Sequence, residues 1–414
     1  MTRPLTDMQG EILDRVPLLE LTDVDYQAAV GGVLGTEVIA PEDLPGFENA
    51  AMDGFAVVAS DVTRAPVELL VIDDIAAGSL PSTPVSSGTA SRIMTGAPIP
   101  PGADAIVPVE ATEAIEGNRV RMLEPTGAGD HIRPIGGSVR RGDRVFGPGL
   151  RLRARHVSVL ASMGIRPVVR RRPVVALMST GDELVPPSTQ NLKAGSVRDS
   201  NRTLLMGLLD ELGVEVKDYG IVTDSAVSFE AVFDEAAVDA DAIVTSGGVS
   251  MGAYDVVKLS LRELGTVDFW KIAMQPGKPL GFGTVAGTPF FGLPGNPVSV
   301  FVSFEQFMRP ALLSMMGADR LFRDRIPGVL DDGIETNPEK VVFARVTVER
   351  GRDGRWHARS AGGQSSNVLS ALAFADALAV VPVGVGRVDP GGAVELEMIA
   401  WPEARTREEA LGAR

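Results

Sequence analysis

Cysteine is absent from the 414-residue sequence, which excludes disulfides, thiolate metal sites and thiol catalysis. Histidine occurs only three times, at well-separated positions, so a zinc centre built from histidines is not expected. The sequence has no apolar leader at its amino terminus and no apolar run of about 18 residues. We therefore expect a cytoplasmic protein with no membrane partner.

Basic residues are also fewer than acidic residues. The chain has 39 Lys and Arg against 54 Asp and Glu, which gives a net charge of −15. Such a balance does not favour non-specific binding to nucleic acid. If this acidic protein binds an anionic ligand, it needs metal ions or a few well-placed lysines to do so.

The familiar catalytic signatures are missing as well. Gly277 and Lys278 are followed by Pro279, where a phosphate-binding P-loop requires Ser or Thr. No dinucleotide-binding glycine fingerprint, His-Glu-x-x-His pair or Gly-x-Ser-x-Gly elbow occurs in the sequence. The P-loop, Rossmann, zincin and α/β-hydrolase classes therefore have little support.

Alternating strand and helix patterns dominate residues 172–316. The expected strands cover residues 174–178, 214–219, 242–245, 269–274 and 289–293, and the expected helices 200–212, 225–238, 254–264 and 298–316. This alternation predicts a mostly parallel sheet with helices on both faces. Short alternating runs predict β-rich segments over residues 66–147 and 325–401, whereas helical patterns occupy residues 1–40 and 151–164.

Three glycine-containing loops each follow an apolar run, at residues 246–255, 275–279 and 293–297. If they leave one edge of the sheet, they form the kind of crevice where open α/β folds bind ligands. The first loop has the composition of a backbone anion site, but Asp255 would repel a phosphate there. A bridging Mg²⁺ would remove that conflict. The alternative is that all three loops are ordinary βα turns.

Several polar residues on these and other turns have two interpretations each. Asp182 is either a helix cap or a ligand, and Asp224 is a plausible helix cap. Asp53 suits a solvated turn, and Thr95 suits a hydroxyl-closed turn. Lys278, between a glycine and a proline, is better explained by an anion than by a structural role.

A series of motifs occupies residues 49–56, 94–100, 179–184, 246–250, 255, 276–279, 292–299 and 362–366. In these motifs the chain resembles the molybdopterin molybdenumtransferase family, which includes MoeA and the gephyrin E domain. The resemblance covers nearly the whole chain in the family's motif order.

The resemblance implies a multidomain α/β plus β architecture whose centre is a molybdopterin-binding α/β domain with a mostly parallel sheet. The implied domains are a helical and extended domain (1–45 with 140–170), an inserted β-rich domain (46–139), the α/β domain (171–322), a carboxy-terminal β-barrel (323–403) and a tail (404–414). It also implies a homodimer.

The activity implied by the resemblance is molybdenum insertion into adenylylated molybdopterin, with release of AMP and Mg²⁺ as cofactor. Other proteins of molybdenum-cofactor synthesis are candidate partners. The implied catalytic residues are Asp53, Thr95, Glu183, Asp224 and Asp255, with Asp224 and Asp255 also as metal ligands. The implied substrate-binding residues are Asp182, Asn201, Ser246, Gly247, Gly248, Ser250, Lys271, Lys278, Pro294, Asn296, Pro297, Arg345 and Ser365.

Two departures from the family pattern leave alternatives open. Ser138 stands where an aspartate is common, and Gln275 stands where a lysine is frequent. One alternative is a non-catalytic or altered paralogue that carries molybdopterin, and another is a tungstate-inserting homologue. A nucleotide-processing enzyme sharing only the α/β domain fits less well, because the motifs at both ends of the chain also match.

Overall fold

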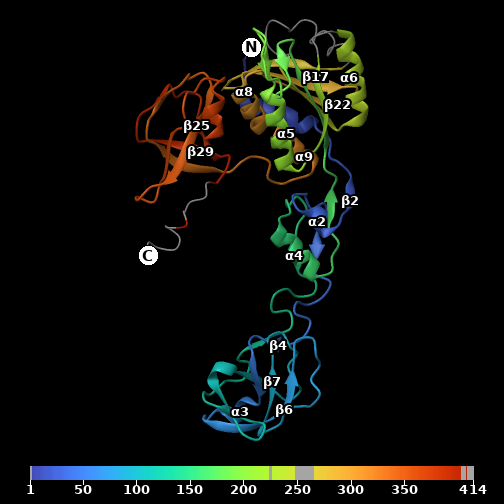
Figure 1. The fold of residues 1–414 in the computed structure, drawn as a ribbon, viewed down its shortest axis with the longest axis vertical. Helices are drawn as coiled ribbons and strands as arrows, with labels where there is room; N and C mark the ends of the chain where they lie inside the picture. Colours follow the sequence, from blue (N-terminus) through green and yellow to red (C-terminus); the bar gives the residue numbers. More distant parts are fainter. Residues whose placement is uncertain (1, 223–225, 248–264, 402–406, 408–414) are drawn as a thin grey trace. The chain divides into compact units, whose positions relative to one another are not determined.

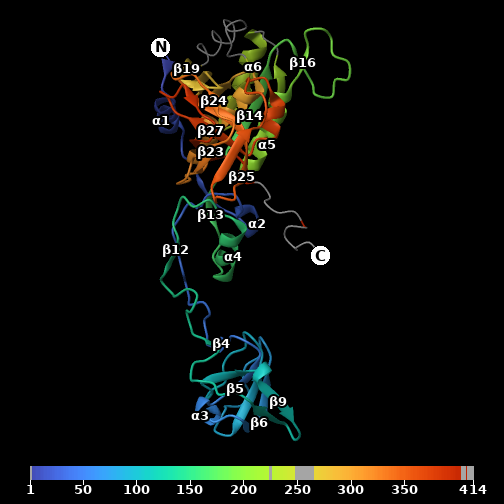
Figure 2. The same cartoon turned by 90° about the vertical axis from the view of Figure 1, so that its left-hand side faces the viewer.

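A computed structural model describes residues 2–222, 226–247, 265–401 and 407 of the chain. The chain divides into two compact units (Figures 1 and 2). Unit 1 comprises Met1–Gly35, Pro148–Val157 and Pro167–Arg414, and unit 2 comprises Thr36–Gly147 and Ser158–Arg166.

A seven-stranded sheet forms the centre of unit 1, in the order β1-β19-β21-β22-β18-β14-β17. All strands are parallel except β21, which is antiparallel to both of its neighbours, so the expected mostly parallel sheet is confirmed. The bounds are β1 Thr2–Arg3, β14 Val174–Thr180, β17 Glu215–Val222, β18 Ala242–Ser246, β19 Asp268–Ile272, β21 Pro279–Val285 and β22 Thr288–Leu293.

Helices cover both faces of this sheet because successive strand residues point to opposite sides. In β14, Val175 and Leu177 pack into the larger core, whereas Ala176 and Met178 pack into the smaller one with Phe233. The larger core also includes residues of α1, α5, α8 and α9, and the smaller one includes residues of α6 (Figure 1). The helices are α1 Leu5–Arg15, α5 Ser200–Leu212, α6 Ala226–Asp239, α8 Pro297–Ser303 and α9 Arg309–Met315.

Two features of this domain differ from the expected elements. The helix expected over residues 298–316 contains a π-helical turn at Phe304–Met308, and β21 was not expected. Glycine at 281 and 283 weakens the strand pattern of β21. Its Phe282 nevertheless fills the core, in ring contact with Phe291 at 5.2 Å between centroids. The expected helix 254–264 lies outside the described residues.

A closed β-barrel occupies the carboxy-terminal part of unit 1. Five strands follow each other in the order β25-β26-β23-β29-β27, and pairing of β25 with β27 closes the ring. The bounds are β23 Arg325–Leu330, β25 Val341–Arg350, β26 Trp356–Ser360, β27 Ala377–Val381 and β29 Gly392–Met398. Short elements accompany them: β20 Met274–Gln275, β24 Ile334–Glu335, β28 Arg387–Val388 and α10 Leu369–Ala373. The expected terminal barrel is therefore confirmed.

Unit 2 contains a six-stranded sheet in the order β8-β5-β7-β6-β10-β9, as expected for a β-rich segment. The strands are β5 Gly54–Val57, β6 Val67–Ile75, β7 Thr89–Ile93, β8 Ala105–Pro108, β9 Thr112–Ile115 and β10 Arg119–Met122. Shorter elements are β3 Val38–Ile39, β4 Asn49–Ala50, β11 Ile132–Arg133, β12 Arg144–Phe146, α3 Ala59–Val62 and the 3₁₀ turn Val109–Ala111. Helix α4, Ala154–Ser162, contributes residues to both units.

The helical pattern expected through residue 40 is wrong beyond α1. After α1 the chain forms β2 Leu21–Asp23, which pairs with β13 Val168–Arg170, and the four-residue α2 Tyr26–Ala29. Gly31 then adopts φ +87°, a left-handed conformation that ends the helical path. Val33 and Leu34, beyond this turn, are buried and form isolated strand bridges with Arg151 and Val169 instead of belonging to a helix. Within the described residues, no helix is long and apolar enough to cross a membrane.

Candidate functional site

The carboxyl ends of three neighbouring parallel strands meet at one edge of the unit 1 sheet. Ser179 lies opposite Ser246, and Ser246 lies opposite Leu293. The Ser179 and Ser246 hydroxyls are buried and hydrogen-bonded to each other at 3.1 Å. The loops after β14, β18 and β22 therefore begin side by side. Of the three loops expected at one edge, 246–255 and 293–297 begin here, and the turn 275–279 joins the carboxyl end of β19 to β21 at the same edge.

Gly247, directly after β18, lies close to Thr180 at the end of β14. Its φ is +88°, and a Cβ added here would lie 2.5 Å from the carbonyl oxygen of Thr180. Its N–H donates to the carbonyl of Leu293 at 3.1 Å, so this amide is already committed within the protein. The expected backbone anion site therefore depends on the rest of the loop. Gly248, Ser250 and Asp255 of that loop, like Asp224, lie outside the described residues.

Two buried polar atoms near this edge have no hydrogen-bond partner within the described part of the chain. They are the Thr180 hydroxyl and the Asn201 Oδ1. The Asn201 amide group donates to the carbonyl of Gly295 at 2.7 Å, which joins helix α5 to the third loop. Buried polar groups are normally satisfied, so an unpaired hydroxyl and an unpaired carbonyl oxygen at a strand edge are suited to a polar ligand.

The acidic pair after β14 is exposed, and no helix starts there. Residues 184 and 185 form strand β15, Leu184–Val185, which pairs with β16, Val197–Arg198. The helix-cap interpretation of Asp182 is therefore wrong, and helix α5 is capped by Asp199, which accepts from the Arg202 N–H at 3.1 Å. Glu183 places its carboxylate against Gly181, 2.7 Å from the position a Cβ would take there.

Lys271 and Lys278 lie at the same sheet edge. Lys271 is opposite Pro279 in the antiparallel β19–β21 pair, and the carbonyl of Lys278 accepts from the Ile272 N–H at 2.7 Å. Gly277, with φ +97°, turns the chain immediately before Lys278. Both lysine side chains are exposed, and no ion pair to either is found among the described residues.

A cavity of about 730 Å³ brings residues of this edge together with the barrel loop 362–366. The Asn296 amide donates to the Ser366 hydroxyl at 2.9 Å, and the Val298 N–H donates to the Ser366 carbonyl at 3.2 Å. Pro297 begins helix α8 and Pro294 is buried, so prolines on both sides stiffen this contact. The polar lining residues are Gln275, Lys278, Asn296, Ser299, Lys340, Gln364, Ser365, Ser366 and Asn367.

The charge of this cavity is opposite to that of the whole chain. Two lysines, Lys278 and Lys340, line it, and among the described residues no aspartate or glutamate does. The chain as a whole carries a net charge of −15. Lysine ammonium groups, hydroxyls and side-chain amides are donors that recognise an oxyanion. The lining of the cavity therefore has the chemistry that suits an anionic ligand.

Arg345 supports the barrel side of this site. Its side chain is 1% exposed, and its Nη2 donates to the carbonyls of Gly363 at 3.0 Å and Ser365 at 3.2 Å. Gln364 accepts from the Arg345 N–H at 3.0 Å and donates back to its carbonyl at the same distance. Burial lowers the pKa of Arg345. Arg345 also lines an adjoining cavity of about 630 Å³ with Gln275.

Unit 2 brings Asp53 and Thr95 together. The N–H and the hydroxyl of Thr95 both donate to Asp53 Oδ1, each at 2.7 Å. The hydroxyl bond, followed by the backbone bond, lowers the pKa of Asp53, so this exposed carboxylate stays ionised near neutral pH. Ser138 is exposed in the same unit.

A magnesium ion has only part of its expected ligand set within the described residues. No group of three or more His, Asp and Glu side chains in that part of the chain is placed to hold a metal. Asp182 and Glu183 are exposed carboxylates at the sheet edge, and Mg²⁺ prefers oxygen ligands of this type. These two carboxylates are of the donor type that Mg²⁺ prefers, while the two expected metal ligands, Asp224 and Asp255, lie outside the described residues.

Six polar residues of this region were not singled out in the sequence: Thr180, Ser299, Lys340, Gln364, Ser366 and Asn367. Thr180 and Gln364 stand inside recognised motifs, and Ser299 ends one, so motif membership could have found them. Lys340 precedes strand β25 in a stretch with no catalytic signature, and only tertiary contact places it in the cavity.

The fold and site define a molybdopterin-binding enzyme of molybdenum-cofactor synthesis. Three family descriptions match the chain: the MoeA N-terminal region (domains I and II) over residues 3–164, a probable molybdopterin-binding domain over 176–314, and the MoeA C-terminal region (domain IV) over 327–399.

Relatives match over nearly their full length. The chain is 40% identical over 401 residues to molybdopterin molybdenumtransferase 2 of Mycobacterium tuberculosis, covering 94% of this chain and 98% of that protein. It is 35% identical over 400 residues to molybdopterin molybdenumtransferase of Haemophilus influenzae, covering 95% and 98%. The chain belongs to the molybdopterin molybdenumtransferase family.

A solved structure agrees with this family assignment. The crystal structure of the molybdopterin biosynthesis moeA protein from Pyrococcus horikoshii OT3 superposes with a TM-score of 0.81 at 28% identity. It covers 96% of this chain and 100% of that chain. The family resemblance seen in the motifs is therefore confirmed.

Proposed function

We propose that this chain transfers molybdenum from molybdate to adenylylated molybdopterin and cleaves the adenylate. The observation that carries the proposal is the near-complete match to molybdopterin molybdenumtransferases, at 40% and 35% identity. Its substrates are the pterin nucleotide and the oxyanion, and its products are molybdenum cofactor and AMP. Cleavage adds water across the phosphoanhydride: a new P–O bond forms to the water oxygen, and the bridging P–O bond breaks.

The sheet edge is the proposed location of the pterin nucleotide. The unpaired Thr180 hydroxyl and Asn201 Oδ1 can bind its polar groups, and the Lys271 ammonium can offset phosphate charge. Ser246 and Gly247 let the ligand approach the strand end closely. Gly248 and Ser250, outside the described residues, complete the proposed binding loop.

The cavity of about 730 Å³ is the proposed location of the oxyanion. Lys278 supplies positive charge there, and Ser365 and Asn296 supply hydrogen-bond donors. Pro294 and Pro297 fix the wall, while Arg345 positions the Ser365 loop through its two carbonyl contacts. A pterin bound at the strand edge would then lie near the anion it receives.

Catalytic roles are proposed for Asp53, Thr95, Glu183, Asp224 and Asp255. Asp53, kept ionised by Thr95, can orient water by accepting a hydrogen bond from it. Asp224 and Asp255 would hold Mg²⁺, with Asp182 and Glu183 as neighbouring carboxylates. When bound, the ion would neutralise phosphate charge and favour departure of AMP.

The direct test measures AMP release by chromatography after incubation with adenylylated molybdopterin, molybdate and Mg²⁺. We expect AMP only in the complete mixture, and less when Lys278→Gln replaces the wild-type chain. Lys193→Gln, at an exposed lysine outside the cavity, should release AMP like the wild type. Pterin nucleotide binding with no AMP release would instead support the molybdopterin carrier. Competition between molybdate and tungstate in the same assay separates the tungstate-inserting alternative.

A homodimer is part of the proposal and rests on the family resemblance. Other proteins of molybdenum-cofactor synthesis are proposed as transient partners that deliver the pterin nucleotide or accept the product. Neither nucleic acid nor a membrane is among the proposed partners, and we propose a cytoplasmic location.

A further inference from the structure

One short segment contributes lining residues to three cavities of unit 1. This partition loop, residues 336–340, connects β24 to β25. Asn337 and Glu339 line both the largest cavity, about 1380 Å³, and the cavity of about 630 Å³. Lys340 lines the largest cavity and the cavity of about 730 Å³ that we assign to the oxyanion.

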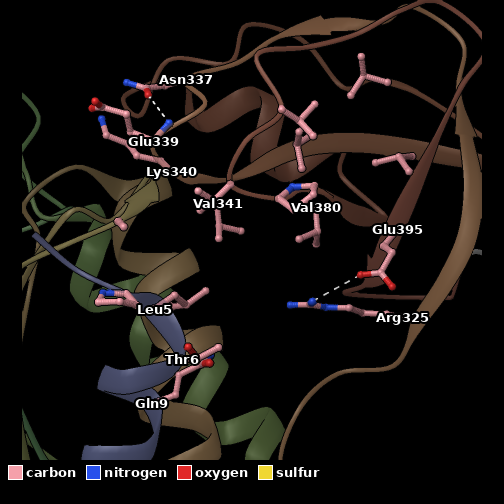
Figure 3. A pocket seen from close by; sticks show the side chains of 18 of the residues that line it. Leu5, Thr6, Gln9, Arg325, Asn337, Glu339, Lys340, Val341, Val380 and Glu395 are labelled. Carbon is pink, nitrogen blue, oxygen red and sulfur yellow. Dashed lines mark hydrogen bonds and ion pairs between the residues drawn. The ribbon is translucent and has the colours of Figure 1, made fainter.

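The largest of these three cavities is mostly apolar. Two of the cationic side chains that line it, Arg325 and Lys340, differ in whether they form ion pairs. Figure 3 shows valines such as Val341 and Val380 on its wall, with Lys340 at one side and Arg325 at the other. Arg325 is neutralised by Glu397 at 2.8 Å and Glu395 at 3.6 Å. No such ion pair to Lys340 is found among the residues that the structure describes.

Lys278 also lines both the largest cavity and the oxyanion cavity. The two lysines therefore stand on the wall shared by the two spaces. Glu339, next to Lys340 in sequence, lines the other two cavities but not the oxyanion cavity. Glu339 therefore adds no negative charge to the lining of the oxyanion cavity, whereas Lys340 adds a positive charge to it.

We propose that Lys340 is a second oxyanion-binding residue, which acts with Lys278 on the molybdate dianion. Two ammonium groups balance the charge of a dianion, whereas Lys278 alone leaves half of it uncompensated. Gln275 lines the same cavity but carries no charge, so the second cation comes from the barrel side of the site. This inference rests on the proposed function and deepens it by assigning a residue to oxyanion affinity. A lysine that is merely solvated would have no effect on oxyanion affinity, which gives the experiment a clear alternative.

Equilibrium dialysis of the full-length protein against molybdate, with bound molybdenum measured by elemental analysis, tests the assignment. Loss of one charge-assisted contact in Lys340→Gln should weaken molybdate binding about tenfold. Lys340→Arg keeps the charge and should stay within about twofold of wild type. Lys340→Met is a second neutral variant, and Lys193→Gln is the matched control at an exposed lysine that lines none of the three cavities.

A second measurement separates oxyanion binding from general damage. In the AMP-release assay, Lys340→Gln should raise the KM for molybdate about tenfold and leave kcat close to wild type. Its affinity for adenylylated molybdopterin without molybdate should be unchanged. Wild-type molybdate affinity in both neutral variants overturns the assignment, and so does an equal loss of pterin nucleotide affinity. If the wild type releases no AMP, the proposed function fails, while dialysis still decides the role of Lys340.

Discussion

His357 shows how a single ionisable side chain is tied into the barrel. Its Nδ1 is 2.7 Å from Asp331 Oδ1, and its Nε2 is 3.2 Å from both carboxylate oxygens of Asp353. Hydrogen bonding to Asp331, and then to Asp353, raises the pKa of His357. The same contact with His357 is the main reason that the pKa of Asp331 is lowered.

The raised pKa predicts a pH-dependent contribution to stability. The His357 contribution is fully present below its unfolded pKa of about 6.5 and is lost as pH rises through the folded value. We expect His357→Gln to lower the thermal midpoint more at pH about 5.5 than at pH about 8.5, because only the charged imidazole gains from both carboxylates. Equal losses at the two pH values, measured by calorimetry, would contradict this role.

The cavity lysines illustrate the limit of inference at the residue scale. Lys278 was identified from its position between Gly277 and Pro279, a local signal. Lys340 has no comparable neighbours, because it owes its place to the partition loop between β24 and the barrel strand β25. Its side chain joins residues from another domain only after the chain has folded.

At the scale of elements, the turn after β18 depends on Gly247. Both its φ of +88° and the 2.5 Å approach of Thr180 oxygen exclude a side chain without local movement. We predict that Gly247→Ala reduces AMP release and lowers the thermal midpoint, with a strain cost of about 1–3 kcal/mol.

Gly287→Ala is the matched control for that prediction. Gly287 has a φ of +89° in the β21–β22 turn, but nothing lies within 4 Å of its added Cβ. It should incur the backbone cost alone and keep normal AMP release. Equal AMP release from the two alanine variants would rule out a close approach at Gly247 as a requirement for activity.

The π-helical turn holds a buried ionic network. Glu305, 2% exposed, accepts two hydrogen bonds from Arg323, at 2.9 and 2.8 Å, and lies 3.7 Å from Arg309. Burial lowers the pKa of Arg309 to about 10, whereas the bond to Glu305 is the main factor that raises the pKa of Arg323. One buried carboxylate thus serves two half-buried guanidinium groups.

Removing that charge should be costly. Glu305→Gln leaves both arginines without a buried counter-charge, and we expect a loss of about 3 kcal/mol in unfolding free energy. The exposed pair Glu335–Arg387, at 3.1 Å, gives the control, because Glu335→Gln should cost no more than about 1 kcal/mol. Denaturant midpoints and slopes for the three proteins decide the comparison. A Glu305→Gln loss no larger than the control would sink the prediction.

At the scale of the whole molecule, the proposed homodimer makes a simple prediction. One chain has a mass of 43.6 kDa, so light scattering after size-exclusion chromatography should give about twice that value. The mass should not change with molybdate, since the proposed cavity lies within one chain. A mass of one chain at micromolar concentration would remove the dimer from the proposal.

The sequence by itself determined most element types of the α/β domain, because hydrophobic period, glycine and proline are local signals. Strands β14, β18 and β22 followed from apolar runs, and their parallel arrangement followed from the helices between them. Motifs then placed Asp53, Asn296 and Lys278 on turns. The β-rich segments 66–147 and 325–401 were likewise visible as short alternating runs.

Tertiary structure alone decided the pairings that span long distances in sequence. The β25–β27 closure, the antiparallel β21 and the pairing of β2 with β13 depend on contacts between remote segments. The oxyanion cavity is of this kind too, because Lys278 and Lys340 become neighbours in its lining only when the barrel packs on the α/β domain. Local sequence patterns indicate which face of a helix or strand is buried, but not which remote segment of the chain covers that face.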